Sequence, residues 1–432
     1  MSSRVASFPS PVDVTVPAAG TGAYPPLSFA RGVMVTFVTR VLGILIGLVT
    51  LTLTTRLLGP EGRGQFAVVM ATLAMILQFG NAGLHASATY VLAQDPKRRS
   101  AVGHLLAWFS AGPVTVLAVA GLLIAWLWPA LVPNVPLTQL AIALLGAPPS
   151  MFLLLAGNAL LGLGRPAAFN LLDLAGRLAG GAAVLLLLVW SDLRIVFGAY
   201  AGLHYVAAAA AYVTLVGYSS PRRPDAATAR SMMSFGGRVF VVNLAMFLVL
   251  RLDLFLLNAL RGTADAGIYS VAVQIGDIMM LTSASIAAML FPRLTAMPPL
   301  QRWRASVKVL RVSAAILTLV AVALAAAARP LVVAWFGAPF ADATIALYWL
   351  LPGLWCLGLN TLLHQHLAAF GMPGFLVAST SVGAVLNALL NAWAIPQYGV
   401  VGAAAVSSVT YVVLLAATVW YIGRSGGRVF RA

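Results

Sequence analysis

Residues 234–293 read SFGGRVFVVNLAMFLVLRLDLFLLNALRGTADAGIYSVAVQIGDIMMLTSASIAAMLFPR. It holds two apolar runs joined by a short polar turn at 261–265. The first run contains Arg251 and Asp253, and the second contains Asp277. Charges inside apolar runs of membrane length are costly, so they usually face the interior of a helix bundle, a partner or water. The stretch therefore predicts two membrane-spanning helices whose charges are kept away from lipid.

The same pattern occurs a second time near the N-terminus. Four positions recur at a constant offset of 203 residues, so that Gly59, Gly64, Phe66 and Val68 correspond to Gly262, Gly267, Tyr269 and Val271. We therefore expect two halves built on one plan, with charges distributed unequally between them.

The composition indicates a protein with many membrane spans. Of the 432 residues, 61% are apolar and only 8% are charged, and the mean hydropathy is +0.96. A soluble domain carries about 25% charged residues, whereas runs of about 20 apolar residues can cross a bilayer. We expect twelve spans, at residues 32–58, 64–93, 102–127, 137–162, 167–190, 194–217, 235–260, 265–291, 307–328, 344–369, 374–394 and 399–422.

The net charge of +16 would also suit a nucleic-acid-binding protein. However, the basic residues recur in every second loop instead of forming one patch, which is the pattern that membrane orientation produces. With the N-terminus inside, seventeen Lys and Arg residues fall in inner segments. The five in outer segments or at outer span ends are Arg56, Arg63, Arg194, Arg261 and Arg329. We therefore expect a plasma-membrane protein with both termini in the cytoplasm and no nucleic-acid partner.

Five segments follow from this pattern. We expect a disordered cytoplasmic tail at 1–28, a six-helix lobe at 29–218, a cytoplasmic linker at 219–230, a second six-helix lobe at 231–423 and a cytoplasmic tail at 424–432. Because six is even, the two lobes have the same orientation and are related by a pseudo-two-fold axis along the membrane normal. The predicted fold class is an all-α polytopic membrane protein, and transporters built from such repeats bind substrate between the halves.

Several motifs resemble those of the bacterial polysaccharide flippases of the O-antigen type. They are RLLGPEGRGQF at 56–66, FGNAGL at 79–84, RLD at 251–253, GIYSVA at 267–272 and FPRL at 291–294. This resemblance implies a central cavity between two lobes that rock between inward-open and outward-open states. It also implies export of a lipid-linked (polyprenyl-pyrophosphate) oligosaccharide from the inner to the outer leaflet, for surface polysaccharide synthesis.

The same superfamily holds two alternatives, the lipid II flippases and the cation-coupled multidrug extruders. Lipid II flippases typically have fourteen spans, whereas we count twelve. Extruders tend to carry acidic residues in the first span, where this chain has Arg40. Both alternatives are therefore disfavoured against export of a lipid-linked oligosaccharide.

Six charged or titratable residues within the spans are candidate substrate contacts: Arg40, His85, Arg177, Arg251, Asp253 and Asp277. The three arginines would suit an anionic ligand, because guanidinium groups bind phosphate oxygens in a bidentate way. For two of them a structural ion pair is an equal alternative. Arg177 follows Asp173 by four residues on one helix, and Arg251 lies within reach of Asp277 across the hairpin.

No sequence feature indicates an enzyme. The chain lacks a G-x-x-x-x-G-K-[ST] loop for ATP and any nucleophile with a positioned base. His364 and His366 lack further ligands at metal-binding spacing, so we expect no metal and no cofactor. The expected partners are the lipid-linked substrate and membrane lipids, with polysaccharide polymerase or ligase machinery as a candidate, and we expect a monomer.

Overall fold

The computed structural model of the protein describes residues 26–217, 226–295, 297–369 and 374–424. Within these ranges the chain is helical, without strands. The predicted tail at 1–28, linker at 219–230 and tail at 424–432 fall largely outside the described residues.

Eight helices form the N-terminal part of the chain. They are α1 (Pro26–Asn81), α2 (Leu84–Gln94), α3 (Arg99–Ala111), α4 (Pro113–Leu127), α5 (Leu137–Leu144), α6 (Ala147–Gly162), α7 (Pro166–Leu185) and α8 (Leu193–Val216), with short 3₁₀ turns η1 (Pro96–Arg98), η2 (Pro129–Leu131) and η3 (Leu186–Leu188). The C-terminal part comprises α9 (Ala226–Arg261), α10 (Thr263–Thr295), α11 (Pro299–Leu331), the π-turn η4 (Val332–Phe336), the 3₁₀ turn η5 (Ala338–Phe340), α12 (Asp342–Ala368) and α13 (Gly374–Arg424).

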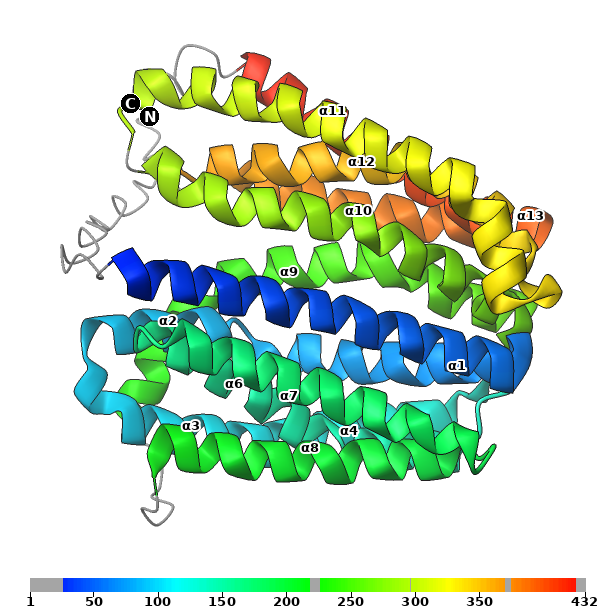
Figure 1. Ribbon diagram of the computed structural model, residues 1–432, viewed down its shortest axis with the longest axis horizontal. Helices are drawn as coiled ribbons and strands as arrows, with labels where there is room; N and C mark the ends of the chain where they lie inside the picture. The colour runs from blue at the N-terminus through cyan, green and yellow to red at the C-terminus, as the bar shows by residue number, and fades with distance from the viewer. Residues whose placement is uncertain (1–25, 218–225, 296, 370–373, 425–432) are drawn as a thin grey trace, which may run out of the picture.

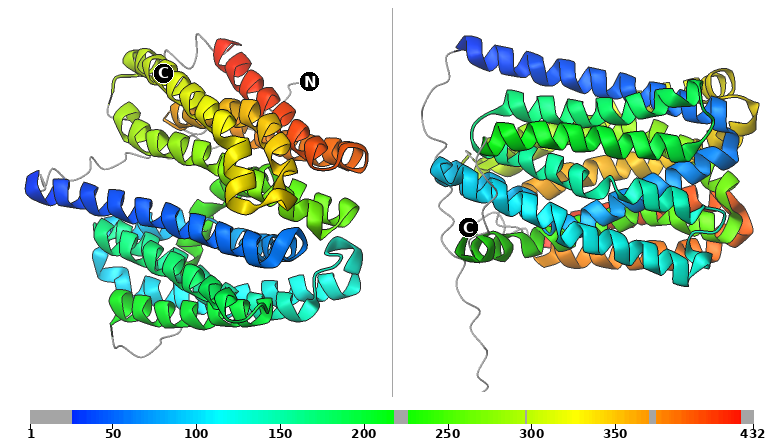
Figure 2. Two further views of the ribbon diagram at one scale, coloured as in Figure 1. Left: turned by 45° about the vertical axis from the view of Figure 1, so that its right-hand side comes forward. Right: turned by 90° about the horizontal axis from the view of Figure 1, so that it is seen from below.

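The elements form two lobes that lie side by side, α1–α8 in one and α9–α13 in the other (Figures 1 and 2). The lobes meet mainly where α1 packs against α10 and α9. The all-α, two-lobe fold predicted from the sequence is therefore confirmed. Apolar side chains face outward over much of the bundle, among them Trp126, Val206 and Leu319, as expected for helices surrounded by lipid.

Ten helical segments in the described part of the chain are long and apolar enough to span a membrane. Two of them, at 41–81 and 374–424, contain a glycine with non-helical backbone angles, Gly59 (φ 65°) and Gly399 (φ 54°). A positive φ strains any residue with a Cβ but not glycine, so the chain can turn sharply at these two points. Both glycines fall at predicted boundaries between spans, although twelve separate spans remain a prediction.

Three predicted spans are broken near their middle. The span at 64–93 is interrupted at Gly83 (φ 77°), the span at 102–127 at Gly112-Pro113, and the span at 137–162 at Gly146. Each break coincides with a glycine or with a proline that lacks an amide hydrogen to continue the helix. Counting apolar length alone does not detect such breaks.

The kink in α1, the turn between α9 and α10, the junction of η4 and η5, and the kink in α13 all lie at one end of the bundle, on the right in Figure 1. They contain Gly59, Gly262, Gly337 and Gly399. We call this end of the bundle the Gly59 end. The start of α1 and the end of α13 lie at the opposite end, which we call the terminal end. We call the lobe of α1–α8 the N-lobe and the lobe of α9–α13 the C-lobe.

Two glycines that correspond to each other in the repeat bring the backbones of the two lobes into close contact. A Cβ on Gly64 would lie 1.7 Å from the carbonyl oxygen of Thr263, and a Cβ on Gly267 would lie 2.0 Å from that of Pro60. Thr263 and Pro60 are themselves related by the offset of 203 residues. The contact is thus reciprocal, as a two-fold relation between the halves requires, and it has room only for glycine.

A second contact at the Gly59 end joins α1 to the η4 turn of the other lobe. Arg56 donates hydrogen bonds to the carbonyl oxygens of Trp335 (2.7 Å) and Ala334 (2.5 Å). The indole Nε1 of Trp335 donates in return to the Thr52 hydroxyl at 2.7 Å. The η4 turn continues directly from α11, so these bonds attach the end of α11 to the α1 side of the interface.

Candidate functional site

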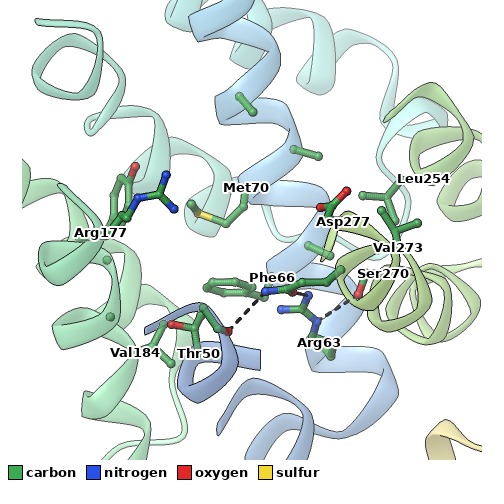
Figure 3. A pocket seen from close by; sticks show the side chains of 18 of the residues that line it. Thr50, Arg63, Phe66, Met70, Arg177, Val184, Leu254, Ser270, Val273 and Asp277 are labelled. Atoms are coloured by element: carbon green, nitrogen blue, oxygen red, sulfur yellow. Dashed lines mark hydrogen bonds between the residues drawn. The ribbon is translucent and has the colours of Figure 1, made fainter. Parts of the chain in front are cut away.

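A cavity of about 420 Å³ lies between the two lobes. Its walls come from α1 and the paired helices α7 and α8 on one side, and from α9 and α10 on the other. Figure 3 shows Arg177 on the N-lobe wall, Asp277 and Ser270 on the C-lobe wall, and Phe66 and Met70 between them. Since the cavity spans the boundary between the lobes, any movement of one lobe against the other changes its shape.

The lining contains six pairs of positions related by the repeat offset of 203 residues. They are Gly47/Leu250, Thr50/Asp253, Ala67/Ser270, Met70/Val273, Ala71/Gln274 and Ala74/Asp277. The cavity is therefore built around the pseudo-symmetry axis. In four of the six pairs, the C-lobe member is more polar than its N-lobe counterpart. This asymmetry makes the C-lobe wall the hydrogen-bonding side of the cavity.

Arg63 is the cavity residue that the sequence analysis missed, because its position before an apolar run placed it with the outer-loop arginines. The structure buries it, with 5% of its surface exposed. Its guanidinium donates to Ser270 Oγ (3.0 Å), Gln274 Oε1 (2.8 Å) and Thr54 Oγ1 (3.1 Å). Within the described part of the chain, it forms no ion pair with a carboxylate. A usable signal was present, since its repeat counterpart is the uncharged Ala266.

The other two lining arginines each have an acidic partner. Arg251 Nη2 lies 3.1 Å from Asp277 Oδ2, which joins α9 to α10, and Arg177 Nε lies 2.9 Å from Asp173 Oδ2, within α7. About half of the Arg177 side chain remains exposed. Both ion pairs that the sequence left as structural alternatives are therefore present, yet Arg177 and Arg251 still face the cavity.

The Asp253 carboxylate is directed into the C-lobe. Its Oδ2 accepts hydrogen bonds from the Tyr269 hydroxyl and from Ser407 Oγ (3.0 Å), and its Oδ1 accepts from the Leu254 amide at 2.8 Å. The residue is 1% exposed, although it also contributes to the lining. Arg251 forms its ion pair with Asp277 and not with Asp253. Asp253 ties α9 to α10 and α13.

The other two predicted substrate contacts are His85 and Arg40. His85 lies on α2, outside the cavity lining, where its Nδ1 lies 3.0 Å from Asn81 Oδ1. Arg40 lies on α1, but its side chain is outside the described part of the structure. Of the six candidates, the structure therefore gathers four around one cavity: Arg177, Arg251, Asp253 and Asp277.

The charge of the cavity favours anions. Its charged lining residues are three arginines and two aspartates. Asp253 accepts hydrogen bonds from C-lobe hydroxyl groups, and Asp277 is neutralised by its ion pair with Arg251. Arginine presents several N–H groups in a planar fork that matches the oxygens of carboxylate and phosphate groups. The arrangement can therefore bind an oxyanion between the lobes, and it offers little to a cationic ligand.

The fold is shared with solved transporters of the MOP superfamily. An inward-facing multidrug resistance MATE family transporter superposes with a TM-score of 0.73, at 14% identity over 89% of this chain and 95% of that chain. Lipid II flippase MurJ, in an inward closed conformation, gives a TM-score of 0.68 at 12% identity, over 91% and 87% of the two chains. An outward-facing MATE transporter gives 0.64 at 15% identity, over 93% and 95%. At these identities the likeness concerns the fold.

The search of curated proteins found no significant match. The sequence profile of one family, described as polysaccharide biosynthesis protein, matches residues 29–297. That range covers more than half of the chain and includes the α1, α9 and α10 walls of the cavity. The chain is thus a multi-pass membrane protein that belongs to the polysaccharide biosynthesis protein family.

Proposed function

We propose that this protein is a flippase that moves a lipid-linked oligosaccharide, carried on polyprenyl pyrophosphate, from the inner to the outer leaflet of the bacterial plasma membrane. The observation that carries the proposal is the three-arginine cavity between the lobes of a polysaccharide biosynthesis family member. The pyrophosphate is the one strongly anionic part of such a substrate, and guanidinium groups bind phosphate oxygens well.

The size of the cavity supports binding of the head group alone. Pockets of about 300–1,000 Å³ hold molecules of drug size, and this cavity is about 420 Å³. A pyrophosphate with its first sugar matches that volume, whereas a full oligosaccharide and a polyprenyl chain exceed it. The rest of the substrate must therefore lie outside the lining residues, or the lobes must separate to admit it.

Transport then follows from movement of the lobes. Repeat-built transporters expose a site between their halves first to one side and then to the other. We place the terminal end in the cytoplasm, because most basic residues lie in the segments at that end. The close contact at the Gly59 end then closes the outer side in this structure, and transport requires that contact to open.

Two related functions are less well supported. A multidrug extruder for cations would need acidic groups that are free to bind them, whereas both lining aspartates have partners within the protein. A lipid II flippase would carry the same pyrophosphate, so it differs from the proposal in the group attached to that pyrophosphate. Neither alternative is an enzyme, and the proposed reaction makes and breaks no covalent bond.

Deletion of the gene tests the proposal. The lipid-linked units should accumulate on the inner leaflet, and surface polysaccharide should be lost while peptidoglycan synthesis continues. Extraction and leaflet-selective labelling of the lipid-linked sugars measures this. Intact surface polysaccharide together with accumulation of cationic dyes would favour an extruder, and a block in peptidoglycan synthesis would favour a lipid II flippase.

Complementation with single variants tests the role of the cavity. Arg177→Gln removes a charge from the lining but keeps hydrogen bonding, so it should insert normally and export about tenfold less or worse. The control is Arg329→Gln, at the Gly59 end of α11 and outside the lining, which should export normally. Equal export by the two variants would show that the charge of the cavity does not matter.

A further inference from the structure

We propose that Arg63 is an anion-operated clasp between the lobes. In the structure it holds the two lobes together through neutral hydrogen-bond acceptors. A phosphoryl or similar oxyanion group in the cavity takes over its N–H groups and so releases the Gly59 end. The proposed function supplies the natural ligand, a pyrophosphate group, and the clasp itself rests on the contacts of Arg63.

The first observation is that Arg63 links the lobes. Arg63 lies on α1, whereas Ser270 and Gln274 lie on α10 of the other lobe. Gln274 also donates from Nε2 to the carbonyl oxygen of Gly47 on α1, at 3.4 Å. These bonds join α1 to α10 next to Gly64, where the two backbones are in close contact. Release of Arg63 would therefore weaken the lobe contact at this point.

The second observation is that the charge of Arg63 is not neutralised. Arg177 and Arg251 each have a carboxylate within 3.1 Å, whereas Arg63 has only hydroxyl and amide oxygens and the ring of Phe66, whose centroid lies 5.6 Å from its Cζ. Burying a charge without a counter-charge is costly. The bonds to Ser270 and Gln274 are already strengthened by the charge of the guanidinium, but an anionic acceptor adds charge–charge attraction and can take two N–H groups at once. An oxyanion within reach would consequently displace Ser270 and Gln274.

The third observation is that the clasp is an addition to the symmetric scaffold. The repeat counterparts of Arg63, Ser270 and Gln274 are Ala266, Ala67 and Ala71. Alanine at all three positions packs without forming hydrogen bonds, so the reciprocal glycine contact needs none of these polar groups. The donor and its two acceptors across the interface are thus present in one copy only, where they meet at the cavity.

Displacement of Ser270 and Gln274 by an anion couples anion binding to opening of the Gly59 end. A ligand shifts an equilibrium only by its difference in affinity for the two states. An anion cannot pair fully with Arg63 while Ser270 and Gln274 occupy its N–H groups, whereas it can do so once the lobes have separated. Anion binding therefore favours the state that is open at the Gly59 end, and an empty cavity favours the closed one.

The test measures the opening of the Gly59 end in purified full-length protein. Spin labels are placed at two exposed positions, Ser191→Cys in the N-lobe and Ala341→Cys in the C-lobe, in a Cys356→Ala background. Distances are recorded in nanodiscs of zwitterionic lipid, with inorganic pyrophosphate or with chloride at the same ionic strength. We expect pyrophosphate, and not chloride, to lengthen the distance between the labels.

Three variants identify Arg63 as the cause. Arg63→Gln removes the charge that binds the anion, so the distance between the labels should not respond to pyrophosphate, whatever its value without ligand. Arg63→Lys keeps the charge without the planar fork and should need more pyrophosphate for half-maximal opening. Ser270→Ala with Gln274→Ala removes the competing acceptors, so half-maximal opening should need roughly tenfold less, about the effect of one hydrogen bond to a charged group.

Each contrary result has a definite meaning. An unchanged response in Arg63→Gln, or no response in the unmodified protein, overturns the clasp. If Arg63→Gln does not fold, the double variant Ser270→Ala with Gln274→Ala provides the test. A response to pyrophosphate equal to that of the unmodified protein would then overturn the clasp. The same distances are recorded in nanodiscs that contain anionic lipid. Opening there without pyrophosphate, and no further opening when pyrophosphate is added, would mean that a membrane head group binds Arg63, and it would overturn the proposal that the transported substrate does. Intact surface polysaccharide in the deletion strain would overturn the proposed function, and it would leave these distance measurements untouched.

Discussion

Arg251 and Asp277 lie on neighbouring helices of one lobe, and their ion pair closes the hairpin on the cavity side. Counting residues from the turn near Gly262 predicted that the two could meet, because helix geometry sets how far along its helix each residue lies. The sequence left open whether this pair or the substrate holds Arg251. The structure shows that a paired arginine can also line the cavity, so the two roles are compatible.

The ion pair between Arg251 and Asp277 predicts that replacing both residues costs less stability than replacing either one alone. Arg251→Gln and Asp277→Asn should each lower the stability of the purified protein by about 1–3 kcal/mol, since each leaves a half-buried charge without its partner. The double variant should recover most of that stability, while export stays low because the cavity has lost a cation. Thermal unfolding and complementation measure the two effects separately. Full export by the double variant would make the pair purely structural.

Arg177 provides a different test, because its partner Asp173 lies outside the cavity lining. Asp173→Asn should free Arg177 to face the cavity without a counter-charge. An exposed ion pair contributes about 0.2–1 kcal/mol, so affinity for inorganic pyrophosphate should rise about two- to fivefold. Calorimetric titration measures this, with Asp342→Asn at the start of α12 as a control. Weaker binding in Asp173→Asn would mean that the carboxylate positions Arg177 for the ligand.

The burial of Arg63 was not predicted from the sequence. A basic residue beside glycines and a polar turn usually belongs to a loop, and the sequence contains no acid positioned to suggest burial. Its partners are Thr54 on its own helix, and Ser270 and Gln274 more than two hundred residues away. Such neutral partners leave no charge pattern to read, so the one signal in the sequence was the uncharged repeat counterpart Ala266, and the burial of Arg63 became visible in the packing of the two lobes.

Among the elements, α1 and α10 carry the contact between the lobes. Gly64→Ala would place a Cβ 1.7 Å from the Thr263 carbonyl oxygen, and backbone atoms cannot move aside as a side chain can. We expect a loss of about 1–3 kcal/mol, as for overpacking elsewhere, together with a longer distance between labels at Ser191 and Ala341.

The matched control for this prediction is Gly202→Ala on α8, where an added Cβ would meet no atom within 4 Å. Its stability should change by no more than about 0.5 kcal/mol. Thermal unfolding of both variants decides the point. Equal stability of Gly64→Ala and Gly202→Ala would mean that the lobes are not held together at these glycines.

The helix boundaries were predicted unevenly, for a physical reason. Long apolar runs located the spans, because burial in lipid requires length and apolarity. The interruption at Gly112 was missed, since it removes only one or two residues from an otherwise apolar run. The turn at Gly59 was located because polar residues accompany it in the sequence.

At the scale of the whole molecule, the orientation in the membrane can be tested directly. In a Cys356→Ala background, Ser191→Cys at the Gly59 end should react with an impermeant thiol reagent in intact cells. Gln301→Cys, at the start of α11 near the terminal end, should react only after the cells are opened. Both positions are exposed, so accessibility within the protein is matched. The reverse pattern would place both termini outside.

The repeat allowed the two-lobe arrangement to be predicted, because two halves of equal plan and orientation imply a site between them. The sequence did not reveal that repeat-related residues line the same cavity in pairs. A single offset of 203 residues says which positions are equivalent, but not which of them face each other across the axis. That information lies in the packing of α1 on α10, where Gly64 meets Gly267.

The reciprocal contact of Gly64 and Gly267 also bears on the ancestry of the chain. Because the same position meets itself across the axis, one six-helix unit already carries both sides of the interface. A gene for half of this protein could therefore have produced a parallel homodimer before duplication and fusion. In such a dimer every charge would have occurred twice around the axis. Fusion allowed Arg63, Arg251 and Asp277 to appear in one half alone, giving a symmetric scaffold an asymmetric site.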